Sequence, residues 1–159
     1  MFKAENKSSE RSVNYQALLE MAPFYIDPHE TLITVLANIS ALLNFYMDEI
    51  NWVGFYLRDG DDLTLGPFQG LPACTRIKIG RGVCGESASR QETLIVDDVA
   101  AFPTHIVCDT NSKSEICVPL VKGGRVYGVL DVDSPFNTRF DDTDKAMLEK
   151  VAALIVDIL

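Results

Sequence analysis

The sequence predicts an α+β fold in which helices pack on one face of an antiparallel β-sheet. Two turn-forming clusters, residues 58–62 and 122–124, each separate segments rich in β-branched and aromatic residues, which is typical of hairpins. Apolar residues at helical spacing precede the first hairpin and follow the second. Helices, a meander of strands and a closing helix therefore suggest one antiparallel sheet.

The length and composition indicate a single domain with a substantial core. The chain has 159 residues, of which 47% are hydrophobic and 23% are charged. A domain of this size buries roughly 70% of the surface of its unfolded chain, so it needs neither disulfides nor a metal to fold. We expect a flexible tail over residues 1–12 and one domain over residues 13–159.

Helix signals occur near both ends of the chain. A first helix is expected over residues 13–21, ending before Pro23. A second is expected to begin at Asp27 as N-cap, with Pro28 at the first helical position and Glu30 in a capping box, and to run to about Tyr46. Residues 141–159 are expected to form the last helix, with Asp141 or Asp142 as its cap.

Strand signals occupy the middle of the chain. We expect a strand over residues 51–57 with a hairpin partner from Leu63, then a mobile connection over residues 66–85. A short helix (83–89), a short strand (93–96) and an irregular segment (97–113) precede the second hairpin, whose strands are residues 115–121 and 125–133. Long irregular loops in compact domains are usually functional or disordered, and this one contains Cys108.

The charge balance excludes two classes of partner. The chain has 14 basic and 23 acidic residues, for a net charge of −9. Binding to nucleic acid or to anionic membranes depends on clustered Lys and Arg, so neither partner is expected. The chain shows neither an apolar run long enough to span a membrane nor a secretory signal, and we expect a cytoplasmic protein.

Four cysteines, Cys74, Cys84, Cys108 and Cys117, are available for chemistry. Their spacing contains no CxxC, and the two histidines complete no zinc-finger pattern, so we expect neither a structural zinc site nor any other metal or cofactor. Stable disulfides are rare in a reducing cytosol. The cysteines are therefore either buried inert thiols or groups in transient redox chemistry.

Strand alternation gathers acidic side chains on one face of the second hairpin. In the last strand this face is expected to hold Tyr127, Val129, Asp131 and Asp133, and the opposite face Val126, Gly128, Leu130 and Val132. Glu115 on the preceding strand has the parity to lie near Asp131 or Asp133. A solvated face would explain three carboxylates, but like charges facing each other destabilise a sheet, and no Lys or Arg occupies a matching position. The pattern therefore favours a binding site.

Aromatic residues of the first strand have the parity to enclose this acidic face. Trp52 and Tyr56 would form a wall around a small cationic or dipolar ligand, although core packing also explains Trp52. Enclosed carboxylates cannot all ionise, so at least one would hold a proton near neutral pH. A cysteine loop above the site would add a nucleophile, and His105 either helps to form the Cys108 thiolate or has no role.

Six segments in the same order resemble the free methionine-(R)-sulfoxide reductases, which are built on a single GAF domain. They are Asn51-Trp-Val-Gly-Phe-Tyr56, Leu65-Gly-Pro-Phe-Gln-Gly70 with Ala73-Cys74, Gly80-Arg-Gly-Val-Cys-Gly85, Phe102-Pro-Thr-His-Ile-Val-Cys-Asp109, Ser114-Glu115-Ile116 and Gly128-Val-Leu-Asp-Val-Asp-Ser-Pro135. The resemblance covers about residues 13 to 159. It implies that a GAF-like catalytic domain reduces the R epimer of free methionine sulfoxide, with electrons from thioredoxin.

The resemblance also implies a role for each part of the site. Cys108 would attack the sulfoxide sulfur. Glu115, Asp131 and Asp133 would bind the substrate and protonate its oxygen, while Trp52 and Tyr56 would enclose its methyl group and sulfur.

The other cysteines divide between redox and structural roles. By the resemblance, Cys74 would resolve a Cys108 sulfenic acid as a disulfide, and Cys84 would either relay electrons or be an inert thiol. Cys117 departs from the family pattern, so it is either a trap for a side-reaction disulfide or a buried small hydrophobe. A homodimer is compatible with the family, and the alternative function is a non-enzymatic GAF module that binds a small ligand.

Overall fold

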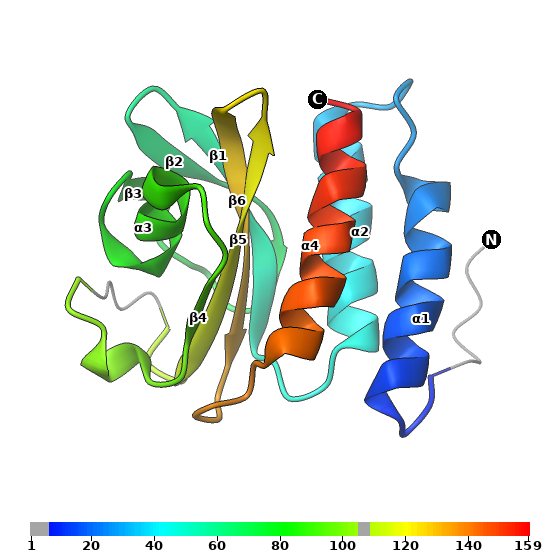
Figure 1. Ribbon diagram of the computed structural model, residues 1–159, viewed down its shortest axis with the longest axis horizontal. Helices are drawn as coiled ribbons and strands as arrows, with labels where there is room; N and C mark the ends of the chain where they lie inside the picture. Colours follow the sequence, from blue (N-terminus) through cyan, green and yellow to red (C-terminus); the bar gives the residue numbers. More distant parts are fainter. Residues whose placement is uncertain (1–6, 105–108) are drawn as a thin grey trace.

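A computed structural model of the chain describes residues 7–104 and 109–159. One six-stranded sheet has the order β3-β2-β1-β6-β5-β4, and every neighbouring pair is antiparallel (Figure 1). The strands are β1 (Trp52–Asp59), β2 (Asp62–Gln69), β3 (Arg76–Lys78), β4 (Leu94–Val96), β5 (Ser114–Lys122) and β6 (Arg125–Ser134). Residues 66–85, predicted as a connection, thus contain the end of β2 and all of β3.

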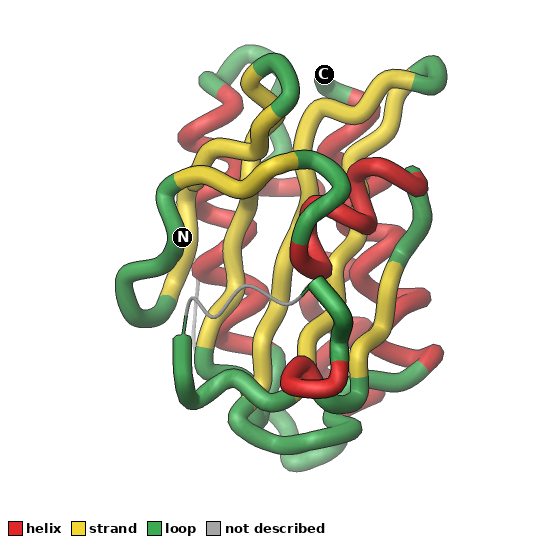
Figure 2. The backbone as a smooth tube through the Cα atoms, turned by 90° about the vertical axis from the view of Figure 1, so that its left-hand side faces the viewer, coloured by secondary structure: helices red, strands yellow, loops and turns green. Residues whose placement is uncertain are grey.

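Helices cover the sheet in layers. The long helices α2 (Leu32–Tyr46) and α4 (Asp142–Asp157) lie against one face, and α1 (Arg11–Met21) packs outside them, followed by the 3-10 helix η2 (Ala22–Tyr25) (Figure 1). The predicted α+β class is confirmed, and the short helix α3 (Gly82–Arg90) lies over the opposite face of the sheet (Figure 2). Within residues 7–104 and 109–159, no helix is long and apolar enough to cross a membrane.

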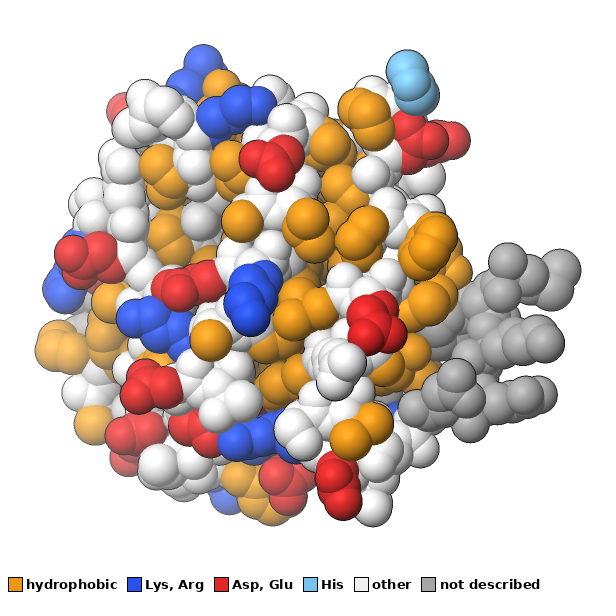
Figure 3. Space-filling view, turned by 45° about the vertical axis from the view of Figure 1, so that its right-hand side comes forward, with side chains coloured by type: hydrophobic (Ala, Val, Ile, Leu, Met, Phe, Trp, Pro, Cys, Tyr) orange, Lys and Arg blue, Asp and Glu red, His pale blue; other side chains and the backbone are white. Residues whose placement is uncertain are grey.

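Hydrophobic side chains reach the surface on the outer side of the helical layer (Figure 3). The large ones include Val13, Phe24 and Ile33, which are 45%, 79% and 66% exposed.

Local capping sets where the helices begin. Asp141 caps α4 and forms a capping box with Asp144, so the predicted cap is confirmed. The prediction for α2 is wrong: Asp27 accepts from the amide of His29 in a turn, and the side chain of Thr31 caps the helix by accepting from Thr34. Two competing cap sequences lie four residues apart, and the second one begins the helix.

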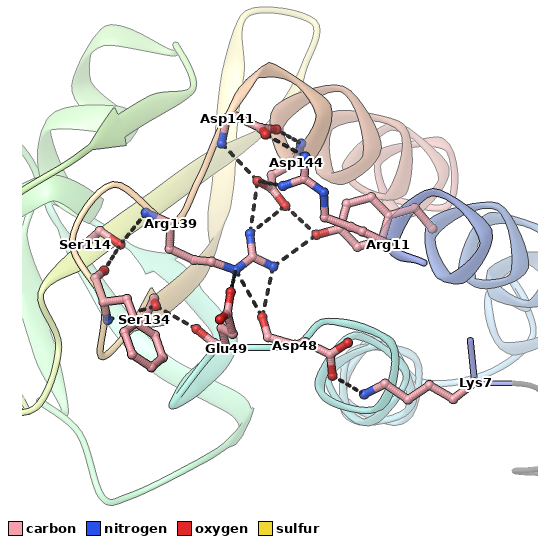
Figure 4. Close-up of polar contacts among 11 residues, drawn as sticks. Lys7, Arg11, Asp48, Glu49, Ser114, Ser134, Arg139, Asp141 and Asp144 are labelled. Carbon is pink, nitrogen blue, oxygen red and sulfur yellow. Dashed lines mark hydrogen bonds and ion pairs between the residues drawn. The ribbon is translucent and has the colours of Figure 1, made fainter. Parts of the chain in front are cut away.

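A buried polar network fixes α1 to the start of α4. The Asp144 carboxylate is fully buried and accepts hydrogen bonds from the Arg139 guanidinium at 3.1 Å and from the Tyr15 hydroxyl. Arg11 adds ion pairs to Asp141 at 2.6 Å and to Asp144 at 3.3 Å (Figure 4). Because Arg11 is held in this way, α1 begins two residues before the predicted Val13.

Replacing Tyr15 by phenylalanine is expected to lower the free energy of unfolding by about 1–3 kcal/mol, because it removes a buried hydrogen bond to a charged carboxylate. Urea denaturation followed by circular dichroism measures this change. Tyr25→Phe, at the half-buried end of η2, is the matched control. Equal stability of the two variants would show that the Tyr15 hydroxyl contributes nothing.

A shift in the β5–β6 pairing reverses side chains near the hairpin. Leu120 pairs with Gly128, but Val121 pairs with Val126, so Tyr127 is an extra residue on β6. Val126 consequently packs in the core beneath α3, and Tyr127 packs against the core on the α2–α4 side. The predicted faces of Val126 and Tyr127 are therefore wrong, because strict alternation cannot anticipate a bulge.

The sheet separates two hydrophobic cores. The larger lies between the sheet and the long helices, and it includes Phe55, Leu130 and Leu148. The smaller lies between the sheet and α3, and it includes Trp52, Tyr56 and Val129. The acidic residues identified from the sequence belong to this second side.

Candidate functional site

A pocket opens on the α3 side of the sheet, the side that Figure 2 shows from the front. Strands β1, β5 and β6 form its floor, and α3 and two loops form its walls. Six of the predicted site residues line it: Trp52, Tyr56, Cys84, Glu115, Asp131 and Asp133.

Strand pairing places the three carboxylates together. Glu115 pairs with Asp133 across β5 and β6. Two residues further along β5, on the same face, Cys117 pairs with Asp131. Glu115 and Asp131 are only 7% and 6% exposed. Among the described residues, none of the three carboxylates forms an ion pair with a basic side chain.

Burial without a cationic partner raises the pKa of each carboxylate. Burial and the neighbouring charges of Asp131 and Asp133 raise the pKa of Glu115 well above its ordinary value. Burial also raises the pKa of Asp133, and it raises that of Asp131 to about 6 although the Cys117 thiol donates to Asp131. The group therefore retains at least one proton near neutral pH and can donate it.

Aromatic rings close the pocket on the β1 side. Trp52 stacks between Phe68, at 5.3 Å between ring centroids, and Tyr56, at 5.9 Å. Its indole N–H donates to the carbonyl of Leu71 at 3.1 Å, which fixes the ring. A Cβ atom at Gly54 would lie 2.3 Å from that of Phe68, so only glycine allows this stack. Trp52 therefore serves core packing and the pocket wall together.

The two free cysteines of the described residues lie at the pocket floor. The Sγ atoms of Cys84 and Cys117 are 3.2 Å apart, and the Cys117 thiol lies 3.2 Å from both a Glu115 and an Asp131 oxygen. Burial raises the pKa of both thiols. Cys117 is fully buried, as expected if it were a small hydrophobic residue of the core. Its thiol nevertheless contacts two of the site carboxylates.

Of the other two predicted cysteines, Cys74 is among the described residues and Cys108 is not. Cys74 is half-buried next to the pocket residue Ala73 and is disulfide-bonded. Its backbone carbonyl accepts a hydrogen bond from the Tyr56 hydroxyl at 3.0 Å. Cys108 and His105 lie outside the described residues.

Two further polar residues of the site were not predicted. Asp109 and Ser112 come from the irregular segment between β4 and β5 and line the pocket. The Asn51 amide donates to both, at 2.9 and 3.0 Å, and so holds this segment at the start of β1. Asp109 and Asn51 occur in the sequence motifs quoted above, whereas no sequence signal singles out Ser112.

Comparison with known proteins identifies the family. The GAF domain model matches residues 27–158. The free methionine-R-sulfoxide reductase of Escherichia coli (strain K12) is 46% identical over 129 residues, which cover 81% of this chain and 78% of that protein. The chain belongs to the free methionine-R-sulfoxide reductase family. The resemblance drawn from the sequence motifs is thus confirmed.

Solved structures of this reductase family have the same fold. A structure of fRMsr of Staphylococcus aureus in its reduced form matches with a TM-score of 0.88 at 51% identity, covering 92% of this chain and 95% of that one. The free methionine-R-sulfoxide reductase of Neisseria meningitidis, in complex with its substrate, matches with a TM-score of 0.93 at 40% identity. The match covers 99% of this chain and 95% of that one.

The three buried carboxyl groups of this reductase are expected to make the free energy of unfolding of the protein fall as pH rises. A carboxyl group whose pKa is higher in the folded state binds more protons when folded, so stability falls between its unfolded and folded pKa values. For Asp131 this window runs from 3.8 to about 6, and the loss is about 3 kcal/mol. Urea titrations at both ends of the window should show a smaller fall for Asp131→Asn; an equal fall would contradict the assignment.

Proposed function

We propose that the chain reduces free L-methionine-(R)-sulfoxide to L-methionine through thiol chemistry, and that thioredoxin recycles it. The observation that carries the proposal is the pocket in which three carboxylates, with no ion pair to a basic side chain among the described residues, face an aromatic wall. Two relatives support it: the Escherichia coli protein is named a free methionine-R-sulfoxide reductase, and the Neisseria meningitidis reductase was solved in complex with its substrate.

The pocket offers a complementary group for each part of the substrate. Glu115, Asp131 and Asp133 accept hydrogen bonds from the substrate ammonium when ionised, and donate to the sulfoxide oxygen when protonated. Trp52 and Tyr56 contact the methyl group and sulfur. The first turn of α3 lines the pocket and has no side-chain cap, so its backbone amides are available to the substrate carboxylate.

The redox step begins at Cys108. Its thiolate attacks the sulfoxide sulfur while the carboxylate cluster protonates the oxygen, so that the S–O bond can break. A bond forms between Cys108 Sγ and the substrate sulfur, and the protonated oxygen leaves as water. A second water molecule attacks Cys108 Sγ and breaks this bond, so the substrate sulfur gains two electrons and leaves as the thioether of methionine. Cys108 loses the same two electrons and becomes a sulfenic acid.

A second thiol then completes the reaction. The Cys74 thiol attacks the Cys108 sulfenic acid, which forms a disulfide and releases one water molecule. The dithiol of thioredoxin reduces this disulfide and becomes oxidised in turn. This pairing is supported by the disulfide at Cys74 and by the free state of both Cys84 and Cys117. In this scheme Cys84 takes no part in normal turnover.

A coupled assay tests the activity directly. With thioredoxin, thioredoxin reductase and NADPH, we expect NADPH oxidation with free methionine-(R)-sulfoxide, none with the S epimer, and little with sulfoxide inside a peptide, because the enclosed pocket excludes a chain. If NADPH is oxidised with neither epimer, the proposed reductase activity is refuted. Saturable binding of methionine without turnover would instead support the ligand-binding GAF module.

Cys74→Ser is expected to separate the chemical step from recycling. The reduced variant should release about one methionine per enzyme in a single turnover and then stop, because no thiol resolves the Cys108 sulfenic acid. Rapid-quench chromatography measures the methionine, and mass mapping detects the missing disulfide. Continued turnover, or a new Cys84–Cys108 disulfide, would contradict the role of Cys74.

The homodimer compatible with the family is also a proposal. Its support is the exposed apolar side chains on the helical side of the molecule (Figure 3). Light scattering at several protein concentrations tests it, and a constant monomer mass would contradict it.

A further inference from the structure

We propose that Cys84, Glu115, Cys117 and Asp131 form a binding site for Zn²⁺ at the floor of the pocket. Cys84 comes from α3, Glu115 and Cys117 from β5, and Asp131 from β6, so no local sequence spacing reveals the set. One ligand atom from each residue lies within 4.8 Å of all the others. Four ligands from three elements thus surround one point.

The distances approach those of a tetrahedral zinc centre. Zn–S bonds of about 2.3 Å and Zn–O bonds of about 2.1 Å place neighbouring ligands roughly 3.4–3.8 Å apart. In the structure Cys117 Sγ lies 3.2 Å from Cys84 Sγ, from Glu115 Oε1 and from Asp131 Oδ1. Cys84 Sγ lies 3.8 Å from Glu115 Oε1. For these four pairs, shifts of a few tenths of an ångström would fit the ion, and the remaining two pairs lie within 4.8 Å.

The donor set and the charge both favour zinc. Thiolates are soft ligands and carboxylates are hard ones, and Zn²⁺ accepts both, whereas Mg²⁺ and Ca²⁺ prefer oxygen alone. All four residues are buried, and in the described part of the chain no Lys, Arg or His pairs with any of them. On binding, the ion displaces the two thiol protons and the proton held by the carboxyl groups to the buffer, and its two positive charges offset two of the four negative charges of the ligands.

The position of the site makes the ion an inhibitor of the reductase rather than a structural metal. Cys84, Glu115 and Asp131 line the pocket, so the ion reaches the site through the opening that substrate uses and occupies the same carboxylates. Cys117 lies beneath them, fully buried. This inhibitory role rests on the proposed function, whereas the binding itself does not.

A cobalt titration tests the binding without reference to activity. The protein is used with Cys74 in its disulfide and with Cys84 and Cys117 as thiols, the form that the structure describes. Co²⁺ should bind at one equivalent, with thiolate-to-metal charge-transfer absorption and the visible bands of tetrahedral cobalt, and Zn²⁺ should displace it. The absence of a charge-transfer band would overturn the site.

Substitutions then assign the ligands. Cys117→Val should weaken Zn²⁺ binding at least roughly 10–100-fold and remove about half of the charge-transfer intensity. Cys84→Ser should have the same effect through the other sulfur. Asp133→Asn is the matched control, because Asp133 lies beside the cluster without belonging to it, and it should leave the cobalt spectrum unchanged. Unchanged binding in Cys117→Val would overturn the proposal.

Activity measurements test the inhibitory role separately. In the thioredoxin-coupled assay, Zn²⁺ should raise the apparent KM for sulfoxide in the wild-type protein. Cys117→Val should retain turnover and lose this sensitivity, which excludes zinc acting on thioredoxin or on Cys74. If zinc binds and the active enzyme is insensitive to it, the inhibitory role is refuted. If the protein binds zinc but reduces no sulfoxide, the proposed function alone fails.

Discussion

Cys108→Ser is expected to abolish turnover, with kcat at least about 1,000-fold below that of the wild-type protein. A serine hydroxyl ionises far less readily than a thiol near neutral pH, and it cannot be oxidised to a sulfenic acid, so no two-electron reduction of the sulfoxide follows. The thioredoxin-coupled assay measures the steady-state rate, and a single-turnover experiment measures released methionine. Neither should exceed the background.

The matched comparison is Cys74→Ser, which should retain the single-turnover burst that Cys108→Ser loses. Far-ultraviolet circular dichroism of both variants controls for folding. If Cys108→Ser merely slows turnover, another cysteine is the nucleophile. Mass mapping of the oxidised variant would then identify it.

Glu115→Gln is expected to lower kcat/KM by about 100- to 10,000-fold, the range for loss of a positioned general acid. Glutamine preserves the shape of the side chain and can still form hydrogen bonds, but it has no acidic proton to give to the sulfoxide oxygen. Glu30→Gln is the matched control, because Glu30 is exposed and lies outside the pocket. Comparable losses in both variants would refute a specific role for Glu115.

The pH profile gives a second test of the same role. Burial and the charges of Asp131 and Asp133 raise the pKa of Glu115, so the acid stays protonated at a pH where an exposed glutamate is ionised. In the wild-type protein kcat/KM should therefore fall as pH rises through this pKa. Glu115→Gln should lack that alkaline decline. A decline of the same size in the variant would assign it to another group.

Local patterns in the sequence predicted much of the fold and the chemical groups of the site. The turn-forming clusters at residues 58–62 and 122–124 contain the two hairpin turns, at residues 60–61 and 123–124, since turn geometry depends on adjacent residues. Strand alternation placed Glu115, Asp131 and Asp133 on one face, because side chains alternate along any regular strand. The reductase family followed from the order of the motifs, and the 46% identity to the Escherichia coli reductase confirms it.

Where two local signals compete, only the packed structure decided between them. The sequence predicted the cap of α2 at Asp27, but the structure begins this helix after Thr31, which is also a residue type that favours the cap position. It also contains no mark of the extra residue at Tyr127, which exchanges the faces of Val126 and Tyr127. A bulge depends on the pairing of two strands, so one strand read alone does not show it.

The composition of the pocket floor was likewise decided by tertiary structure. The cysteine spacing contains no CxxC, so the sequence predicted no metal site, yet the fold brings the sulfurs of Cys84 and Cys117, 33 residues apart in the chain, within 3.2 Å. Asp109 and Ser112 join the pocket through Asn51, from a segment with no periodic pattern. The sequence by itself determined which groups the protein carries and which strand face each acid occupies. Only the packing of α3 and the irregular segment onto the sheet decided which groups meet, because those contacts join residues far apart in the chain.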